Sequence, residues 1–407
     1  MKVLMSSSAS SSHSLSKSLI LLLGLAVGVV AANLYYAQPL VGLISKALNL
    51  DPSLAGLVVT LTQVGYGLGV LMIVPLADIL ENRKLILTMI LLTTVSLLGL
   101  AFATSLIPYF LAALAVGLGA STVQVIVPYA AHLAPEATRG RVVGSLMSGL
   151  MIGIMLSRPI SSLLTDLFSW HAVFYFSAAL MLLLGLALYK LLPERQPTNT
   201  GIRYSKLMAS MGNLFAETPV LRRRAIYQAF MFGAFSLFWT TTPLLLVEEF
   251  HLSQTAIALF ALAGVAGAVS APLAGRMADK GFSRQATTVA MISASVSFLI
   301  THIFAPGSGW ALAILVFAAI LLDAGITANL VLGQRAIFSL SAELRGRLNG
   351  LYVATIFVGG AVGSYVGAWA YAHGGWMLTS WVGFLFPLLA FIYFGTEWLT
   401  GFQKVSQ

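Results

Sequence analysis

The sequence has no cysteine and very little charge. The absence of cysteine excludes disulfide bonds and thiolate metal sites. Only 9% of the 407 residues are Asp, Glu, Lys or Arg, whereas about 25% is usual for a soluble domain. Hydrophobic residues make up 58% of the chain, and its mean hydropathy is +0.92. This composition excludes an ordinary soluble protein and predicts a membrane protein.

Motifs of ATP-driven pumps and of common hydrolases are also missing. No lysine follows a glycine, so the phosphate-binding G-x-x-x-x-G-K-[ST] loop is absent. Neither H-E-x-x-H nor G-x-S-x-G occurs, and the six histidines are scattered. We therefore predict no catalytic residues, no bound metal and no cofactor. The predicted energy source is a proton gradient.

Long apolar runs dominate what is present. A helix needs about 20 apolar residues to cross the roughly 30 Å hydrocarbon core of a membrane. The strands of a membrane barrel would instead alternate apolar and polar residues. The predicted fold class is an all-α polytopic membrane protein. Its apolar runs lie near residues 18–45, 53–77, 85–104, 107–133, 143–166, 171–191, 225–248, 254–278, 286–305, 310–337, 348–371 and 376–398.

A polar stretch near the middle divides the chain into halves. It contains "PERQPTN", "RYSK" and "LRRR" and has little apolar periodicity. We interpret it as a linker that includes a short surface helix. The predicted segments are a disordered tail at 1–17, a six-helix bundle at 18–192, the linker at 193–224, a second bundle at 225–400 and a tail at 401–407.

The positive charges predict the orientation. If both termini face the cytoplasm, the loops on that side hold every Lys and Arg except Lys46 and Arg158. An excess of Lys and Arg in cytoplasmic loops is the usual pattern for membrane proteins. The net charge of +9 then reflects topology, and no nucleic-acid partner is predicted.

The second half of the chain repeats the first. "PEATRGRVVG", which ends at Gly144, matches "AELRGRLNG", which ends at Gly350. Trp170 and Trp376 are separated by the same number of residues as those two glycines. A parallel repeat of six helices predicts two pseudo-symmetric bundles with a binding site where they meet, near the membrane midplane.

These features identify a resemblance. The chain resembles the major facilitator superfamily, and especially its bacterial drug/proton antiporter-like members, which share stretches like "NLYYAQPL" and "GQRAIFSLSAELRGRLNGLY". The resemblance covers residues 18–400. It implies alternating access between two rocking bundles, a lipid-embedded monomer and a small-molecule substrate. The implied location is the bacterial inner membrane, with both termini cytoplasmic.

The family's loop pattern, roughly G-x-L-A-D-R-x-G-R-R, is only partly kept. The first copy retains Asp78 and Arg83, but Glu81 replaces a glycine, and the second copy retains Asp279 and Arg284. Resemblance implies that Asp78 contacts the start of the helix at 348–371, and that Asp279 contacts the start of the helix at 143–166. The predicted cytoplasmic gating residues also include Arg139, Arg141, Arg345 and Arg347.

Two opposite charges are predicted near mid-membrane. Arg158 lies within the run at 143–166, and Asp323 lies within the run at 310–337. A charge at this depth costs about 3 kcal/mol on insertion scales, so it persists when it is paired or faces water. We expect Asp323 to carry the proton, and Arg158 to be its counter-charge or to bind an anionic group of the substrate. A static ion pair that orients helices is the alternative.

Other polar and aromatic residues within the runs are candidates for substrate contact. They could equally hydrogen-bond neighbouring helices, or lie at membrane interfaces. The predicted substrate-binding residues are Asn33, Tyr36, Gln38, Gln124, Trp239 and Asn329.

Two transport functions remain open from the sequence. A single central acid and an aromatic-rich first helix favour proton-coupled export of small lipophilic compounds. Arg158 favours the alternative, which is uptake or facilitated diffusion of a small polar or anionic solute.

Overall fold

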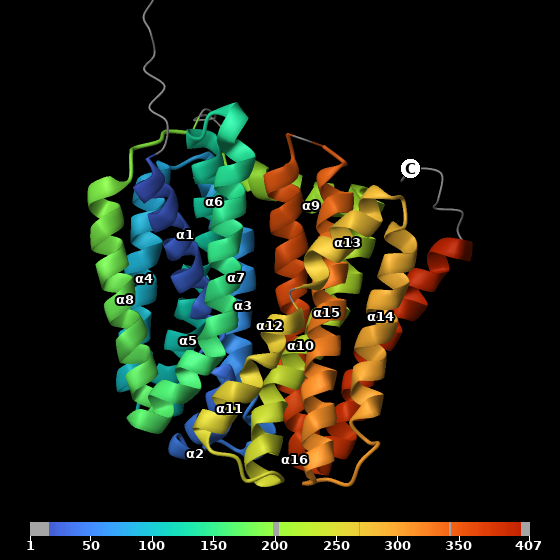
Figure 1. Cartoon of the computed structure of the whole chain (residues 1–407). Coiled ribbons are helices and arrows are strands. Elements are labelled where there is room, and N and C mark those ends of the chain that lie inside the picture. Colours follow the sequence, from blue (N-terminus) through green and yellow to red (C-terminus); the bar gives the residue numbers. More distant parts are fainter. Residues whose placement is uncertain (1–15, 198–202, 268, 342, 400–407) are drawn as a thin grey trace, which may run out of the picture.

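The structure is a computed structural model, and it describes residues 16–197, 203–267, 269–341 and 343–399. Every element in these ranges is a helix, and the helices form two bundles side by side (Figure 1). The predicted tails fall largely outside the described residues, as do 198–202 in the predicted linker.

The first bundle contains the elements up to residue 191. They are α1 (Lys17–Ala32), η1 (Gln38–Leu40), α2 (Val41–Ala47), η2 (Pro52–Leu54), α3 (Leu57–Met72), η3 (Val74–Asp78), α4 (Asn82–Phe102), α5 (Leu106–Ala120), α6 (Val123–Leu133), α7 (Glu136–Leu167) and α8 (Trp170–Leu191).

The second bundle follows the surface helix α9 (Tyr204–Glu217). It comprises α10 (Pro219–Glu248), α11 (Gln254–Ala261), α12 (Ala263–Gly267), α13 (Ser270–Asp279), α14 (Ser283–Ile300), α15 (Gly309–Phe338) and α16 (Arg345–Leu399). Non-helical backbone at Gly374 and Gly375 divides α16 into two membrane-length helices.

The helices match the predicted membrane segments. Among the described residues, nine helical stretches are long and apolar enough to cross a membrane, and one of these is the doubled α16. α1 and α14 are shorter and complete the predicted set. The all-α polytopic fold is thus confirmed.

Several predicted runs are interrupted, and polar side chains bond the backbone at two of the breaks. α1 ends at Ala32, and the side-chain amide of Asn33 donates to the carbonyl oxygens of Val29 and Val30. Between α5 and α6, the hydroxyls of Ser121 and Thr122 donate to carbonyls of the preceding turn. Side chains that bond the backbone in this way slightly destabilise a helix and often bend it.

Glycines bring equivalent helix pairs of the two bundles together. α1 packs on α7, where a Cβ on Gly28 would collide with the Gly149 carbonyl. α10 packs on α16, where a Cβ on Gly359 would collide with the Ala229 carbonyl. The repeat seen in the sequence is therefore a repeat of backbone contacts between helices.

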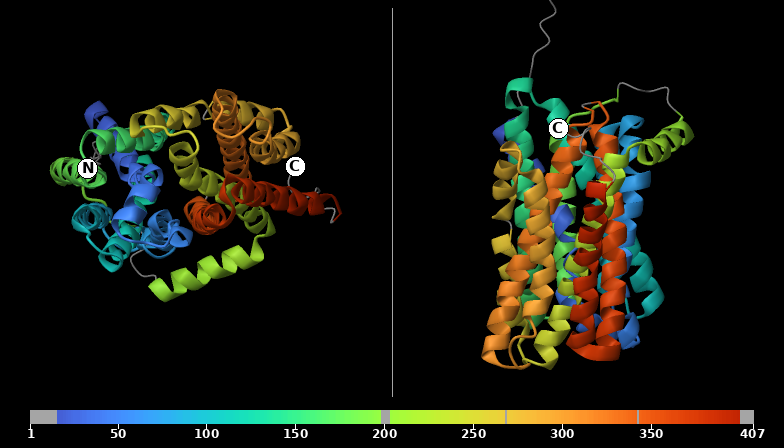
Figure 2. Two further views of the ribbon diagram at one scale, coloured as in Figure 1. Left: turned by 90° about the horizontal axis from the view of Figure 1, so that it is seen from below. Right: turned by 90° about the vertical axis from the view of Figure 1, so that its right-hand side faces the viewer.

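The two ends of the molecule differ. The linker side is the side on which α9, the start of α1 and the end of α16 lie, and the opposite end is the far side (Figure 1). α9 lies across the long helices along one edge of the molecule (Figure 2). The hydroxyl of Tyr204 on α9 donates to the carbonyl of Met72 on α3, at 2.8 Å.

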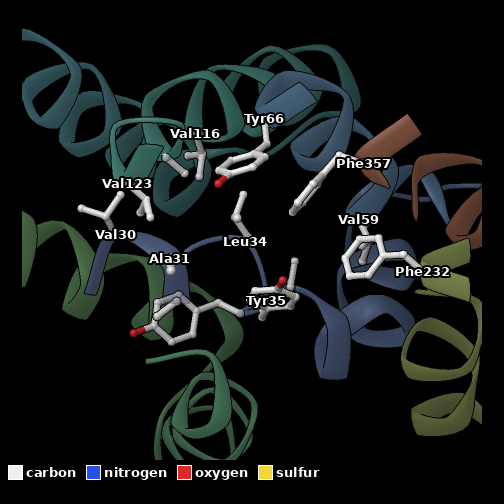
Figure 3. Close-up of a cluster of buried hydrophobic side chains, with 14 of the residues drawn as sticks. Val30, Ala31, Leu34, Tyr35, Val59, Tyr66, Val116, Val123, Phe232 and Phe357 are labelled. Carbon is white, nitrogen blue, oxygen red and sulfur yellow. The ribbon is translucent and has the colours of Figure 1, made fainter. Parts of the chain in front are cut away.

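Contacts between the bundles are distributed unevenly. On the far side, Thr255 Oγ1 of α11 donates to Asp166 Oδ2 of α7 at 2.5 Å. Along the middle, the tilted rings of Tyr66 and Phe357 have centroids 4.2 Å apart, and the ring centroids of Phe357 and Phe232 are 5.1 Å apart (Figure 3). Also on the far side, α7 packs against α11 of the second bundle, whereas the described residues of α7 and α13 make no comparable contact on the linker side. The far side is thus the more closed end.

The segment after α8 is bound to the loop before α4. Glu81 accepts the backbone N–H groups of Arg83, Lys84 and Arg195, at 2.8, 2.8 and 3.1 Å. Burial would raise the pKa of the Glu81 carboxyl, but the backbone N–H groups of Arg195, Lys84 and Arg83 lower its pKa below the ordinary glutamate value. The side chain of Asn82 also accepts from Arg195 Nη1 at 2.5 Å.

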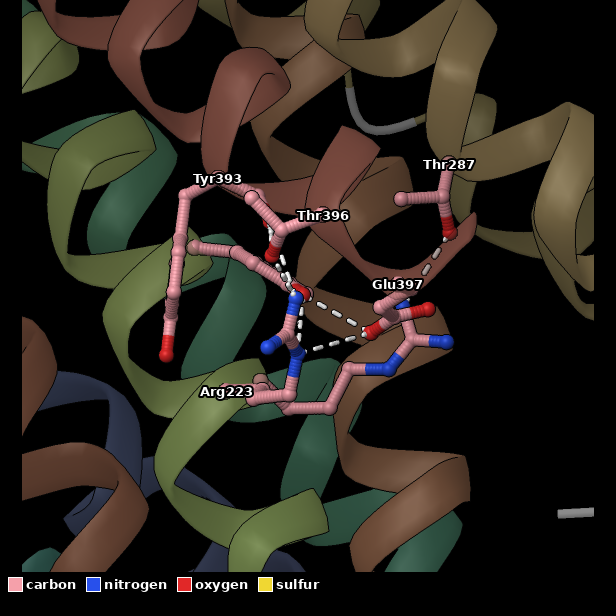
Figure 4. A network of polar contacts seen from close by, with 7 residues as sticks. Arg223, Thr287, Tyr393, Thr396 and Glu397 are labelled. Carbon is pink, nitrogen blue, oxygen red and sulfur yellow. Dashed lines mark hydrogen bonds and ion pairs between the residues drawn. The ribbon is translucent and has the colours of Figure 1, made fainter. Parts of the chain in front are cut away.

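A polar network holds the linker-side ends of α10 and α16 together. Arg223 Nη2 donates to Thr396 Oγ1 at 2.6 Å and to the Tyr393 carbonyl at 2.9 Å (Figure 4). Its Nε lies 3.4 Å from Glu397 Oε1, which also accepts from the Tyr227 hydroxyl at 2.7 Å. These contacts lie within the second bundle and favour its movement as one body.

Candidate functional site

Arg158 lies deep inside the molecule, on the far-side half of α7. Its side chain is buried, and its Nε donates to Gln38 Oε1 at 2.7 Å. Gln38 is placed there by the break after α1, because it begins the short helix η1. The local end of the first helix therefore brings a polar side chain to the arginine.

An aromatic wall surrounds the guanidinium. The Arg158 Cζ atom lies 4.3 Å from the ring centroid of Trp239, 5.1 Å from that of Phe235 and 5.3 Å from that of Tyr35. Tyr35 belongs to the first bundle, whereas Phe235 and Trp239 lie on α10 of the second. Aromatic faces attract a cation, most strongly when it is desolvated, so these rings stabilise the buried charge.

Asp323 reaches the same region from α15. Its Oδ1 accepts the indole N–H of Trp239 at 2.9 Å. Its Oδ2 faces Gly264 of α12, where an added Cβ would lie 2.7 Å from Oδ2 and 3.7 Å from Arg158 Nη1. The carboxylate of Asp323 and the guanidinium of Arg158 thus both lie close to Gly264 of α12. No direct hydrogen bond joins these two described side chains.

Two hydrogen-bond donors at the site are buried and unpartnered. They are Arg158 Nη2 and Gln38 Nε2. A cavity of about 10 Å³ adjoins the arginine on the far side, with walls that include Pro39, Trp239, Pro243 and Phe260. Buried donors normally have a partner, because an unmade hydrogen bond is costly. The arrangement therefore favours binding of an acceptor group.

The predicted substrate-binding residues divide into two groups. The structure brings Gln38 and Trp239 together with Arg158 and Asp323. Asn33 accepts from Ser177 at 2.5 Å within the first bundle, and Asn329 donates to Gln228 at 2.7 Å within the second. These two contacts match the helix-stitching alternative.

Tyr36 and Gln124 lie elsewhere around the centre. Tyr36 is buried, and its backbone carbonyl accepts from Ser161. Gln124 lies toward the linker side, where it donates to the Tyr66 hydroxyl at 3.1 Å and accepts from Asn349 of α16 at 3.0 Å. Gln124 therefore bridges the two bundles.

The predicted gating carboxylates have different partners. Asp78 Oδ2 lies 3.9 Å from Arg347 Nε at the start of α16 and so contacts the other bundle. Asp279 instead pairs with Arg335 of α15 at 2.5 Å, within its own bundle. The expected contact between Asp279 and the start of α7 is not made in this structure, since α7 and α13 are apart on the linker side.

The remaining predicted gating residues lie at helix ends on the linker side. Arg83 donates to the Tyr189 carbonyl at 2.6 Å, Arg139 to the Ala131 carbonyl at 3.0 Å and Arg345 to the Phe338 carbonyl at 3.0 Å. Each of these three arginines thus contacts a carbonyl of its own bundle. Arg141 is exposed at the start of α7, and Arg284 lies in the first turn of α14.

Sequence reasoning missed the glycines and phenylalanines around the charges. Gly264 lies against Asp323 Oδ2, and a Cβ on Gly267 would lie 2.5 Å from Asp323 Cβ. Phe235 and Phe260 contribute to the aromatic wall and the cavity. The "AGVAGA" stretch was a usable signal, since closely spaced glycines often mark close backbone approach. Within the described residues, no group of three or more His, Cys, Asp or Glu side chains could hold a metal ion.

Comparison with known proteins relates the sequence and the fold to a known family. The sequence model described as "Major Facilitator Superfamily" matches residues 23–335. The uncharacterized transporter YgaY of Escherichia coli O157:H7 is 37% identical over 393 residues, which cover 96% of this chain and 98% of that protein. A probable transporter of Streptomyces coelicolor is 32% identical, covering 87% of this chain and 82% of that protein.

Solved structures share the fold. The nucleoside transporter NupG superposes with a TM-score of 0.76 at 12% identity, covering 93% of this chain and 99% of NupG.

Proposed function

The chain belongs to the major facilitator superfamily, and we propose that it is a proton-coupled secondary transporter that works by alternating access. It is a multi-pass membrane protein and a transporter, not an enzyme. We propose that the coupling ion is the proton, that the substrates are small lipophilic compounds, and that the direction of transport is export.

One observation carries the proposal. Asp323 and Arg158, from opposite bundles, are both buried and flank the same point beside α12. A buried carboxylate tends to hold a proton, and a nearby guanidinium favours its ionised form. Rocking of the bundles changes the separation of the two groups, so the carboxylate could gain and lose its proton during the cycle.

Export of small lipophilic compounds fits the aromatic wall. Tyr35, Phe235, Trp239 and Phe260 provide apolar faces from both bundles. Large apolar surfaces with few polar groups are typical of small-molecule sites. In this proposal the proton gradient is the only energy source, the substrate is the only required partner besides lipid, and the protein acts as a monomer in the bacterial inner membrane.

The proposed orientation places the linker side in the cytoplasm. That side carries Arg83, Arg139, Arg222 and Arg345, as expected for cytoplasmic loops. In this structure the far side is held by Thr255 and Asp166, while α7 and α13 are apart on the linker side. The structure then corresponds to a state that is more open to the cytoplasm.

The proposal is tested with Asp323→Asn, which keeps the volume of the side chain and removes its charge. Cells that produce the wild type should survive toxic lipophilic compounds better than cells that produce the variant. In energised vesicles, those compounds should release protons only with the wild type. Equal protection by both proteins would remove Asp323 from the mechanism.

A second candidate is transport of a small polar or anionic solute. The specific observation in its favour is the unpartnered donor pair, Arg158 Nη2 and Gln38 Nε2. The vesicle experiment separates the candidates, because an anion that travels with a proton would carry protons inward instead of releasing them.

A further inference from the structure

Gln38 and Arg158 present buried hydrogen-bond donors for which the aromatic wall offers no acceptor. Arg158 Nε donates to Gln38 Oε1 at 2.7 Å, and this contact fixes the two side chains against each other. Arg158 Nη2 and Gln38 Nε2 remain as donors without an acceptor, and both side chains are buried, at 4% and 0% exposure. Pro39 and Arg158 also line the adjoining cavity.

We infer that Gln38 and Arg158 form a binding subsite for a carboxylate group of the substrate. This inference rests on the second candidate function and names its substrate class, a small organic acid with an apolar body. A guanidinium and an amide N–H are suitable donors for carboxylate oxygens. The cavity of about 10 Å³ has room for only one water-sized group in this state, so the acid enters when the bundles move apart, and the surrounding rings then face its apolar or aromatic body.

The position of Asp323 gives this subsite a consequence for coupling. The same guanidinium faces Asp323 Oδ2 across Gly264. An anion bound to Arg158 offsets the positive charge that favours the ionised form of Asp323. Binding of the anion and protonation of Asp323 therefore favour each other, and the coupling is reciprocal. An organic acid and a proton would occupy the site together and move in the same direction.

Few other groups influence this coupling. The charged or titratable side chains that face Asp323 from neighbouring elements in the described structure are Arg158 of α7 and Tyr35 after α1. The elements α10 and α12 present Trp239, Gly264 and Gly267, which do not titrate. The proton that accompanies the anion is therefore assigned to Asp323.

The test measures binding of formate, acetate and benzoate to the purified full-length protein, with benzamide as the uncharged match for benzoate. Two variants remove the donor of Gln38. Gln38→Glu keeps an acceptor for Arg158 Nε, and Gln38→Met keeps the approximate shape. Each should weaken benzoate binding by roughly tenfold or more, the usual effect of losing a hydrogen bond to a charged group. Benzamide binding should change much less.

Gln63→Met is the matched control. Gln63 is also a buried glutamine of the first bundle, but its Nε2 already donates to Ser236 and its unpartnered atom is the acceptor Oε1. This variant should retain benzoate binding. Equal benzoate affinity in the wild type and both Gln38 variants would overturn the subsite. Failure of all three acids to bind the wild type would overturn it too.

Proton uptake on addition of benzoate, measured in weakly buffered solution, separates this inference from the proposed function. The wild type should take up protons, and Asp323→Asn should bind benzoate without uptake. Benzoate binding that depends on Gln38 but occurs without uptake by the wild type would support the subsite and remove Asp323 from proton coupling.

Discussion

At the scale of single residues, position decides what a polar side chain does. Asn33 and Gln38 are both buried amides of the first membrane segment. Asn33 fills its hydrogen bonds within its own bundle, whereas Gln38 retains an unpartnered donor beside Arg158. An amide with every group satisfied contributes to structure, and one with a spare donor at a cavity can bind a ligand.

Glu81 gives a residue-scale prediction. It replaces a glycine of the family's loop pattern, and its carboxylate accepts three backbone N–H groups. Glu81→Gln should lower the stability of the protein by about 1 kcal/mol, comparable to loss of a helix N-cap. Because the folded protein lowers the pKa of this carboxyl, its contribution is present above the ordinary glutamate pKa and is lost as pH falls through the lowered value. Thermal unfolding in detergent measures both effects.

Thermal unfolding measured at several pH values also provides the control for this prediction. The difference in unfolding temperature between wild type and Glu81→Gln should shrink as the solution is acidified. A difference that stays constant across acid pH would show that the charge of Glu81 is not what stabilises the loop.

At the scale of helices, close approach of backbones explains the glycine pattern. Gly28, Gly149 and Gly153 form the contact between α1 and α7, and Gly233, Gly359 and Gly363 form its counterpart between α10 and α16. Small residues allow this approach, which van der Waals contact then stabilises in a membrane. The contact also positions Arg158, which follows Gly153 on α7 and faces the end of α1.

The glycines of α7 give an element-scale prediction. A Cβ on Gly153 would collide with the carbonyl of Gly28, whereas a Cβ on Gly144 meets nothing within 4 Å. Gly153→Ala should therefore destabilise the protein by about 1–3 kcal/mol, as overpacked sites do. Gly144→Ala is the control on the same helix and should be neutral or slightly stabilising, because alanine favours helix. Equal unfolding temperatures for the two variants would contradict the packing argument.

At the scale of the whole molecule, polar contacts between the bundles are of two kinds. Buried hydrogen bonds join Thr60 to Ser364 and Gln63 to Ser236 along the middle. At the two ends the contacts are exposed, with Thr255 and Asp166 on the far side and Asp78 near Arg347 on the linker side. Exposed pairs contribute little each, about 0–1 kcal/mol. Small contributions at the two ends suit a transporter, because they keep the free energies of the two states close, so that both states are populated.

The far-side contact gives a prediction at this scale. Asp166→Ala should raise the population open to the far side, because the hydrogen bond from Thr255 is lost. The chain has no cysteine, so Leu246→Cys, buried beside the central cavity, can report access without background. A membrane-impermeant maleimide added from the far side should label this cysteine roughly two to five times faster in the Asp166→Ala background.

Glu248→Ala is the matched control for that measurement. Glu248 accepts from Tyr371 at 2.8 Å on the same side of the molecule, but both residues belong to the second bundle. Its loss should leave the labelling rate unchanged. Equal acceleration by both variants would show that a general loosening of the far side is responsible.

The membrane class, the helices and the repeat can be predicted from the sequence, because they follow from hydropathy and spacing along the chain. The sequence also indicated Arg158 and Asp323, since an ionisable residue within an apolar run is costly and therefore conspicuous. Even so, the run at 107–133 could not be separated into α5 and α6 by hydropathy, because it is apolar throughout its length.

Which of the candidate residues lie close together depends on how the helices pack. Gln38 and Trp239 lie at Arg158, Asn329 faces Gln228 within one bundle, and Asp279 pairs with Arg335. Gly264 became part of the site through its approach to Asp323. Hydropathy along the chain indicates how deep in the membrane a residue lies. The rotation of each helix and the position of each bundle depend instead on packing between segments far apart in the chain.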